Sequence, residues 1–209
     1  MKTGGIILAG GHSRRMGAAK ADLQFGNETM LAHTVRIVER AGLRVIVVAA
    51  PNQRLPPLSA NVRVVRDRQP DRGPLEAIAA GLHAWREIDP AVEAVWICAC
   101  DTPLLKPEFI RRMIEMLDAE SDAATPIVDG MPHPLAGAYR VKILPAVERM
   151  LAANQLRLVD LLAQIKTQFV AREELFDVDP ELQSLRNVNT PEEYQAALAA
   201  AGLAGENRM

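Results

Sequence analysis

Short apolar runs alternate along the chain with stretches in which apolar residues recur at helical spacing. Gly5–Leu8 and Val45–Ala49 are continuous apolar runs, which are typical of strands buried on both faces. In Met30–Ala41 and Pro74–Trp85 the apolar residues repeat every three to four positions. The same patterns predict strands at Val62–Val65, Ala94–Ala99, Ala123–Val128 and Leu135–Tyr139, and helices at Pro107–Leu117, Leu144–Ala153 and Leu158–Lys166. We therefore expect a three-layer α/β fold, with helices on both faces of a mostly parallel sheet.

The last predicted helix begins at Thr190-Pro191-Glu192-Glu193. Thr190 suits the N-cap, Pro191 the first turn, and Glu193 the third position of a capping box. No linker, low-complexity stretch or internal repeat interrupts the chain before it. We expect a single domain over residues 1–201, followed by a flexible tail at 202–209.

Composition narrows the class of protein. The 209 residues are 49% apolar but only 4% aromatic, which suits a helix-rich α/β structure better than an all-β sandwich. A net charge of −2 offers no global basic field, so we expect neither nucleic acid nor a membrane as partner. No apolar run approaches the roughly 20 residues that span a bilayer, and we expect a cytoplasmic protein.

The two cysteines, Cys98 and Cys100, are too few for a disulfide framework or a four-cysteine zinc site. They stand two positions apart in and just after a predicted strand, so both point to the same side of the sheet. We expect buried free thiols, as in a reducing compartment.

Candidate chemistry begins directly after the first predicted strand, in the loop Leu8–Lys20. Its glycines let the backbone bring N–H groups close to an anion, and its basic residues supply positive charge. Ligands of α/β sheets bind beyond the carboxyl ends of such strands, which favours a phosphate site over a surface turn with solvated arginines. The loop matches neither the P-loop nor the dinucleotide-binding fingerprint. The residues concerned are Gly10, Gly11, Gly17, Arg14, Arg15 and Lys20.

A carboxylate stands at a comparable place. Asp101 follows the strand Ala94–Ala99 in the segment C-A-C-D-T-P. At the carboxyl end of a parallel strand it would face the same crevice as the first loop, and a hard oxygen ligand beside phosphates suits Mg²⁺. The alternative is an aspartate that only caps the turn before Pro103.

The loop sequence L-A-G-G-x-S-R-R-M-G-x-x-K resembles the signature of the molybdenum cofactor guanylyltransferases, also called molybdopterin-guanine dinucleotide synthases. The segments V-V-R-D, G-P-L, C-D-T-P, H-P-L and N-V-N-T-P-E-E follow in the family's order and extend the resemblance over nearly the whole chain. It implies a Rossmann-like nucleotidyltransferase fold of the nucleotide-diphospho-sugar transferase type. It also implies transfer of GMP from GTP to molybdenum-bearing molybdopterin, with Mg²⁺ as cofactor and pyrophosphate as product.

Carried onto this sequence, the resemblance implies three sets of site residues. The catalytic residues are Lys20, Asp101 and Arg15, with Asp101 as metal ligand. The nucleotide-binding residues are Leu8, Ala9, Gly10, Gly11, Arg14, Lys20, Asp67, Gly73, Pro74 and Asp101. The acceptor-binding residues are His133, Asn187 and Asn189.

Plainer interpretations stay open for several of these residues. Asp67 can pair with Arg66 or Arg68 at the surface, and Gly73-Pro74 can simply start a helix. A histidine between prolines, such as His133, is more often structural than catalytic. Asn187 and Asn189 can serve a turn or a cap. The remaining histidines, His12, His33 and His83, have no partners at metal-ligand spacing.

The sequence departs from the family at two positions. Ala19 stands where many members have an aspartate before the lysine, and Ala49 where some have an asparagine after the second strand. Base selection would then rest on main-chain groups of Leu8–Gly10 and on Gly73-Pro74.

Two other functions are alternatives to guanylyl transfer. One is a related nucleotidyltransferase that uses CTP or a sugar phosphate, and the other is a non-catalytic nucleotide-binding regulator. Retention of both Lys20 and Asp101 favours an enzyme. Its partners would be GTP, molybdopterin, and the proteins that deliver molybdopterin or mature the recipient molybdoenzymes.

Overall fold

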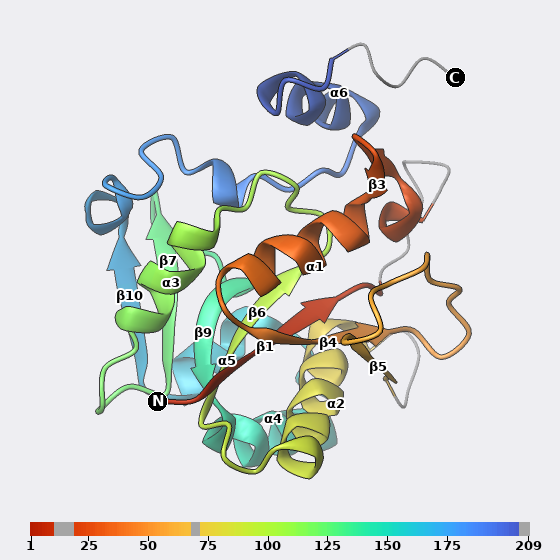
Figure 1. The fold of residues 1–209 in the computed structure, drawn as a ribbon. Coiled ribbons are helices and arrows are strands. Elements are labelled where there is room, and N and C mark those ends of the chain that lie inside the picture. The colour runs from red at the N-terminus through yellow and green to blue at the C-terminus, as the bar shows by residue number, and fades with distance from the viewer. Residues whose placement is uncertain (11–18, 68–71, 205–209) are drawn as a thin grey trace.

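A computed structural model describes residues 1–10, 19–67 and 72–204 of the chain (Figure 1). Its main strands are β1 (Thr3–Leu8), β4 (Arg44–Ala49), β5 (Arg63–Arg66), β6 (Ala94–Ala99), β7 (Ala123–Val128), β8 (Met131–Pro132), β9 (Ala136–Arg140) and β10 (Thr167–Ala171). Over the described residues they form one eight-stranded sheet in the order β10-β7-β9-β6-β1-β4-β5, with β8 paired to β7.

The sheet is mostly parallel, as predicted. Strand β1 pairs in parallel with β4 and β6, β4 with β5, and β7 with β10. The exceptions are β9, which lies antiparallel between β6 and β7, and the short β8, which pairs antiparallel with β7. Because β9 reverses direction, β6 and β7 run the same way although they are not adjacent.

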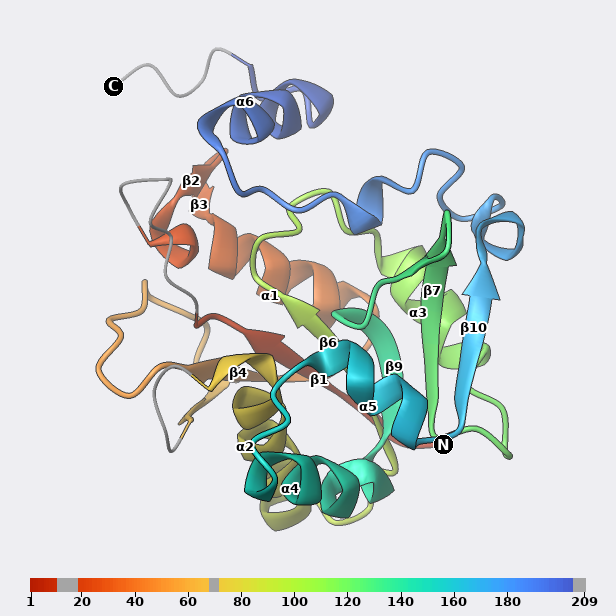
Figure 2. The same cartoon turned by 180° about the vertical axis from the view of Figure 1, so that it is seen from behind.

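Helices cover both faces of this sheet. They are α1 (Met30–Arg40), α2 (Gly73–Ile88), α3 (Pro107–Glu115), α4 (Leu144–Ala152), α5 (Leu158–Gln164) and α6 (Pro191–Ala200). Helices α1 and α3 lie in front of the sheet in Figure 1, and α2, α4 and α5 lie in front of it in Figure 2. The predicted three-layer α/β architecture is therefore confirmed.

Strand β1 contributes side chains to the packing on both faces of the sheet. Successive side chains of a strand point to opposite faces, so Ile6 packs with α2, α4 and α5 while Ile7 packs with α1 and α3. Helix α2 approaches β1 closely at Gly81, where a Cβ atom would lie 2.8 Å from Ile6. This tight packing fixes the edge of the sheet at which β1 ends.

A third, smaller apolar cluster ties α6 to the N-terminal half. The short strands β2 (Gln24–Phe25) and β3 (Glu28–Thr29) form a hairpin before α1. Phe25 and Met30 pack there against Val188 and Leu198. In Figure 1 the dark blue α6 accordingly lies beyond the sheet, next to β3.

The 3₁₀ turns complete the set of elements. They are η1 (Lys20–Asp22), η2 (Val141–Ile143), η3 (Arg172–Leu175) and η4 (Gln183–Leu185). The turn η1 leads into the β2–β3 hairpin, and η4 leads towards α6.

Several predicted boundaries shift. The predicted helix Leu158–Lys166 ends at Gln164, because the chain then turns into β10, an edge strand that the apolar pattern did not predict. The hairpin of β2 and β3 was not predicted either. By contrast, Thr190 caps α6 as expected: its hydroxyl accepts from Glu193 N at 3.2 Å, and the Glu193 carboxylate accepts from Thr190 N at 3.1 Å.

The described part of the chain contains no helix that combines the length and the apolar character needed to cross a membrane.

Candidate active site

Strands β1 and β6 end side by side, with Leu8 in register with Ala99. Beyond this point Cys100 N donates a hydrogen bond to Leu8 O at 3.1 Å, and Ala9 N donates to Val48 O of β4 at 2.8 Å. The segments that follow β1 and β6 therefore leave the sheet at the same place. This is the carboxyl edge of the parallel strands, where α/β sheets bind their ligands.

Three segments distant in sequence meet at this edge. The Nζ atom of Lys20, in η1, lies 2.5 Å from Asp101 Oδ2 and 2.7 Å from Asn189 Oδ1. Lys20 and Asp101 were predicted to be catalytic, and Asn189 to bind the acceptor. The structure thus brings Lys20 into direct contact with a second predicted catalytic residue and with a predicted acceptor-binding residue.

Asp101 is only 9% exposed. Lys20 contacts one of its carboxylate oxygens, whereas the other, Oδ1, is buried and has no hydrogen-bond partner among the described residues. A buried carboxylate oxygen is costly unless it is paired or coordinates a cation. Asp101 Oδ1 thus has the chemistry of a metal ligand.

The described residues include no group of three or more histidine, cysteine, aspartate or glutamate side chains that could hold a metal. Within them Asp101 would be the single carboxylate ligand. That donor set fits Mg²⁺, which keeps several waters and is commonly held by one or two carboxylates together with substrate phosphates.

The segment before α6 is docked onto the turn that holds Asp101. Val188 N donates to Asp101 O at 2.8 Å, and the Val188 side chain is 2% exposed. Asn187 and Asn189, on either side of Val188, are both exposed. They share one face of this segment, but of the two only Asn189 contacts Lys20 among the described residues.

The side of the edge that was predicted to bind the nucleotide is formed by the ends of β4 and β5. Asp67 follows β5, and its N–H donates to Ala49 O at 3.1 Å, so Asp67 stands beside the end of β4. Ala49 is fully buried, and no side-chain polar group is offered at this position.

A polar group nearby was not foreseen from the sequence. Gln53, in the loop after β4, donates from Nε2 to Ala9 O at 2.8 Å and accepts from Ala50 N at 3.1 Å. Its side chain lies against the main chain that was expected to select the base. A lone glutamine in a loop has no local pattern that would single it out.

Helix α2 begins at this side of the sheet. Gly73 has a φ of 71°, a left-handed conformation that favours glycine, and Pro74 follows in the first turn. The free N–H groups of a helix start attract an anion or a polar base edge. Gly73 and Pro74 are therefore placed as the nucleotide side requires, although a simple helix start has the same form.

His133 lies apart from the cluster of Lys20, Asp101 and Asn189. It precedes β9, its N–H donates to Pro126 O at 2.9 Å, and its carbonyl accepts from Thr125 Oγ1 at 2.9 Å. Burial lowers the pKa of its half-buried imidazole. Among the described residues, it makes no hydrogen bond to that cluster.

The predicted residues Gly11, Arg14 and Arg15 lie outside the described residues.

The cysteines behave as predicted. Cys98 and Cys100 are free thiols, 1% and 4% exposed, packed on the α1–α3 side of the sheet. Burial raises the pKa of each thiol to about 12, and the charge of Asp101 adds to the effect at Cys100. The interior directly behind Asp101 is therefore buried and apolar.

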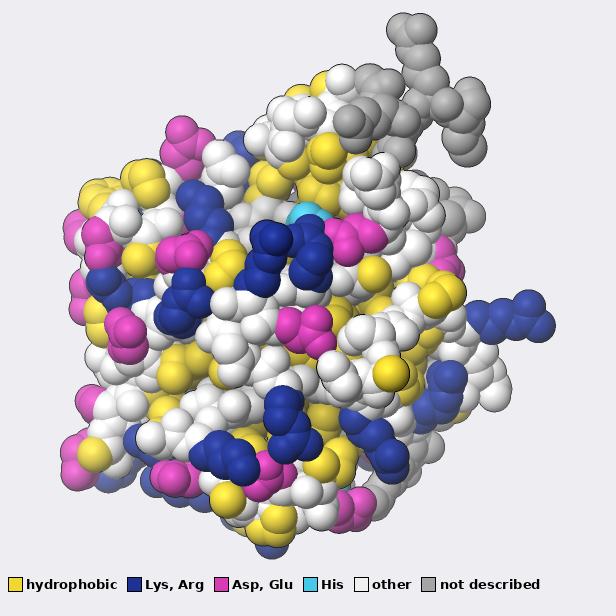
Figure 3. Space-filling view, in the orientation of Figure 1, with side chains coloured by type: hydrophobic (Ala, Val, Ile, Leu, Met, Phe, Trp, Pro, Cys, Tyr) yellow, Lys and Arg dark blue, Asp and Glu magenta, His cyan; other side chains and the backbone are white. Residues whose placement is uncertain are grey.

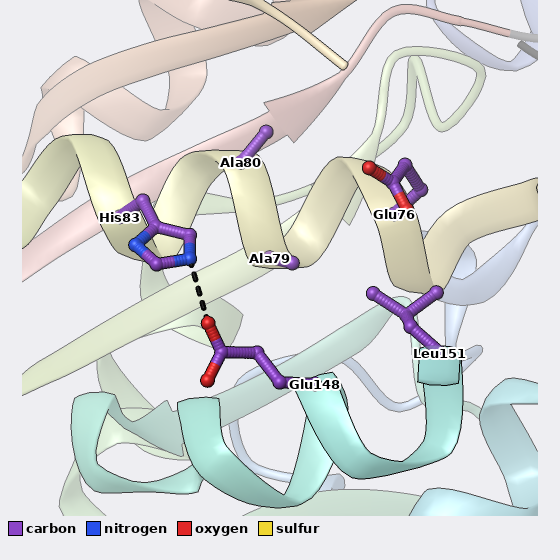
Figure 4. Close-up of a pocket in the computed structure, with 6 residues that line it drawn as sticks. All are labelled: Glu76, Ala79, Ala80, His83, Glu148 and Leu151. Atoms are coloured by element: carbon purple, nitrogen blue, oxygen red, sulfur yellow. Dashed lines mark hydrogen bonds and ion pairs between the residues drawn. The ribbon is translucent and has the colours of Figure 1, made fainter. Parts of the chain in front are cut away.

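A separate hollow lies between α2 and α4 (Figure 4). His83 of α2 and Glu148 of α4 face each other across it, with His83 Nε2 2.9 Å from Glu148 Oε1. The other lining residues are Glu76, Ala79, Ala80 and Leu151. None of the predicted catalytic or acceptor residues lines this hollow.

The surface over α1 and α3 carries acidic and basic side chains interspersed with one another (Figure 3). No large area of one sign dominates the face in view.

Comparison with known proteins agrees with this geometry. The family model of the MobA-like NTP transferase domain matches residues 5–168. The "Probable molybdenum cofactor guanylyltransferase" of Mycobacterium avium is 34% identical over 202 residues, which cover 96% of this chain and 97% of that protein.

Solved structures agree in fold. Molybdopterin-guanine dinucleotide biosynthesis protein A from Archaeoglobus fulgidus has a TM-score of 0.78 at 22% identity, covering 97% of this chain and 99% of the other. The 2-C-methyl-D-erythritol 4-phosphate cytidylyltransferase of Thermus thermophilus has a TM-score of 0.70 at 18% identity, covering 97% and 100%. The expected nucleotidyltransferase fold is confirmed, and the chain belongs to the family of MobA-like NTP transferase domains.

Proposed function

We propose that this protein is a molybdenum cofactor guanylyltransferase. It would transfer GMP from GTP to molybdenum-bearing molybdopterin, giving the guanine dinucleotide form of the cofactor and pyrophosphate. The observation that carries the proposal is the meeting of Lys20, Asp101 and Asn189 at the carboxyl edge of the sheet. The names of relatives that are 34% identical over nearly the whole chain support the same substrates.

In this reaction the terminal phosphate of the pterin attacks the α-phosphorus of GTP, and pyrophosphate leaves. A phosphate monoester dianion is already a nucleophile, so the protein has to position the reactants and offset charge. When Mg²⁺ is bound, it polarises the α-phosphate and orients the leaving pyrophosphate. Asp101 would hold this ion through Oδ1, the buried oxygen that lacks a hydrogen-bond partner among the described residues.

Lys20 would exchange its partner during the reaction. Its ammonium group lies against the Asp101 carboxylate and the Asn189 side-chain oxygen. In the reaction Lys20 would turn to the β- and γ-phosphates and offset their charge, together with Arg14 or Arg15. Lys20 thus links the metal site to the phosphate site.

The nucleotide and the pterin would approach from opposite sides of Asp101. On the nucleotide side we assign Leu8, Ala9, Gly10, Gly11, Asp67, Gly73 and Pro74. Gln53 would add a side-chain amide that Ala49 lacks, since it lies against the Ala9 and Ala50 main chain. On the pterin side we assign Asn187, Asn189 and His133. Proteins that deliver molybdopterin or receive the product would meet the enzyme on this side.

A thermal-shift comparison of GTP, CTP, ATP and UTP, each with Mg²⁺, tests the nucleotide. Selective stabilisation by GTP is expected. Selective stabilisation by CTP would instead favour cytidylyl transfer, and no stabilisation by any nucleotide would contradict the proposed function. Release of pyrophosphate from GTP and Mg²⁺ only when molybdopterin is added would then distinguish the enzyme from a nucleotide-binding regulator.

A further inference from the structure

His33, on α1, is mostly buried, with a side chain 15% exposed. Its Nε2 lies 2.9 Å from the carbonyl oxygen of Pro103. A carbonyl oxygen only accepts hydrogen bonds, so Nε2 carries a proton and donates it. Pro103 stands two residues after Asp101, and the imidazole therefore holds the turn that presents the metal-ligand carboxylate.

The other ring nitrogen fixes the orientation of the imidazole. Nδ1 lies 2.9 Å from Glu28 Oε1 and 2.9 Å from Arg36 Nη2. Partial burial raises the pKa of Glu28, but hydrogen bonds from Arg36 and His33 outweigh it and hold the pKa below its ordinary value. An ionised glutamate and a guanidinium thus flank Nδ1 and fix the orientation of the ring.

The same ring also contacts the segment that follows Lys20. Its centroid lies 4.7 Å from that of Phe25, a buried residue of β2. Phe25 is joined to Lys20 through η1, and Pro103 is joined to Asp101 through a tight turn in which Leu105 N donates to Thr102 O. His33 thereby touches both segments whose side chains meet at 2.5 Å.

Neighbouring groups restrain the turn from other directions. Thr34 Oγ1, next to His33 on α1, lies 3.3 Å from Cys100 O, and Val188 N lies 2.8 Å from Asp101 O. The carbonyl groups of Cys100, Asp101 and Pro103 are thus each contacted by a donor from another segment. Val188 and His33 both also pack against Phe25, on the Lys20 side; of these two, His33 contacts the turn through its side chain and Val188 through its main chain.

We propose that His33 is a positioning residue that sets the placement of Asp101 relative to Lys20, and thereby the affinity of the site for a divalent cation with GTP. This inference rests on the proposed function, because it assigns Asp101 to the metal. His33 itself touches neither substrate nor metal. It acts through the Pro103 carbonyl and the Phe25 ring.

Two substitutions distinguish the loss of the hydrogen-bond donor to Pro103 from a change in the space that the side chain fills. In His33→Gln, the longer side chain can place an amide N–H where Nε2 stands. In His33→Asn, the shorter amide reaches only the position of Nδ1 and leaves Pro103 O without its donor. Mn²⁺ binding in the presence of GTP, followed by electron paramagnetic resonance of the free ion, reports on the site without turnover.

We expect His33→Asn to weaken Mn²⁺ binding about 10- to 100-fold, the range found when groups that orient a metal ligand are removed. His33→Gln should stay close to wild type, and so should the matched control His83→Asn on α2. Equal Mn²⁺ affinity in wild type, His33→Gln and His33→Asn would overturn the proposal. The proposal would also be overturned if Mn²⁺ binding weakened equally in both His33 variants and only in proportion to their loss of thermal stability.

Two further outcomes are decided by the same measurement. If wild type binds Mn²⁺ and GTP but His33→Asn does not fold, Glu28→Gln is measured instead. It keeps the Pro103 contact but loosens the ring, and unchanged Mn²⁺ affinity in this folded variant would overturn the proposal. If wild type itself binds no Mn²⁺ with GTP, the proposed function fails and the role of His33 fails with it.

Discussion

The carboxyl edge of the sheet and the hollow between α2 and α4 each hold a histidine 2.9 Å from a glutamate. At the sheet edge the second nitrogen of His33 bonds the turn of Asp101, and its ring packs on Phe25. In the hollow, His83 has no further hydrogen bond within the described residues, and Glu148 is 50% exposed on its side-chain surface. A histidine–glutamate pair therefore has a different structural role in each region, because of these two histidines only His33 also contacts two other segments.

The ion pairs of the two regions differ in the same way. Lys20 and Asp101 come from separate loops, and their side chains are only 20% and 12% exposed. His83 and Glu148 bridge two helices at the surface, where such pairs contribute little. The comparison predicts large functional effects from substitutions at the sheet edge and small effects in the hollow.

The largest expected effect comes from Asp101→Asn, which removes the metal-ligand charge while keeping the shape of the side chain. We expect kcat to fall by about 10³-fold, because stabilisation of the transferring phosphate is lost. Pyrophosphate release measures it, with circular dichroism to check folding. The matched change Glu148→Gln in the hollow should leave kcat unaltered, and comparable losses in both variants would end the distinction between the regions.

We expect the two buried thiols behind Asp101 to be unreactive. Because burial raises the pKa of Cys98 and Cys100 to about 12, little reactive thiolate forms at pH 8. We expect both thiols to react with a disulfide reagent slower than a free cysteine by about two orders of magnitude or more. Ala80→Cys, which places a thiol in the hollow, should add one fast-reacting group, and fast reaction of the native thiols in folded protein would show an open interior.

A smaller loss is expected from Lys20→Met. The variant removes the contacts to Asp101 and Asn189 and the charge proposed to face the phosphates. We expect kcat/KM for GTP to fall about 100-fold. Lys142→Met is the control, since Lys142 pairs with Asp122 before β7, at the opposite edge of the sheet. If Lys142→Met proved as harmful as Lys20→Met, loss of any lysine would explain the result.

The smallest effect is expected in the hollow itself. His83→Ala breaks a pair whose members are 32% and 50% exposed, so the free energy of unfolding should fall by less than about 1 kcal/mol. Urea unfolding measures the change, and kcat should stay at the wild-type value. A clear loss of activity in the folded variant would give the hollow a role that its geometry does not indicate.

Much of the fold followed from local pattern. The continuous apolar runs around Ile6 and Val47 predicted buried parallel strands, and Thr190 and Glu193 predicted the start of α6. Edge strand β10 was missed because Phe169 is exposed while Val170 is buried, and so short an alternation carries little signal. The β2–β3 hairpin has only two residues in each strand and no apolar period of its own.

The site was foreseen in part. Asp101 at a strand end and Lys20 at the end of a glycine-containing loop are local signals, and both were named from the sequence. Gln53 was not named, and His33 was named only as a histidine without partners at metal-ligand spacing, because their contacts are with Ala9 and Pro103, far away along the chain. A single polar residue in a loop or helix looks the same whether it faces solvent or a distant carbonyl.

The sequence by itself determined the alternation of strands and helices, the family resemblance and the residue types able to hold phosphate and metal. Periodicity and capping are properties of neighbouring residues, so they can be read along the chain. Tertiary structure alone decided that β9 enters the sheet in the reverse direction, that Val188 docks on the turn of Asp101, and that Lys20 reaches both Asp101 and Asn189. These contacts join segments that lie far apart in the sequence, so no local sequence pattern predicts them. The sequence therefore names Lys20 as a charged group of the candidate site, and the packing of distant segments decides that it meets Asp101 and Asn189.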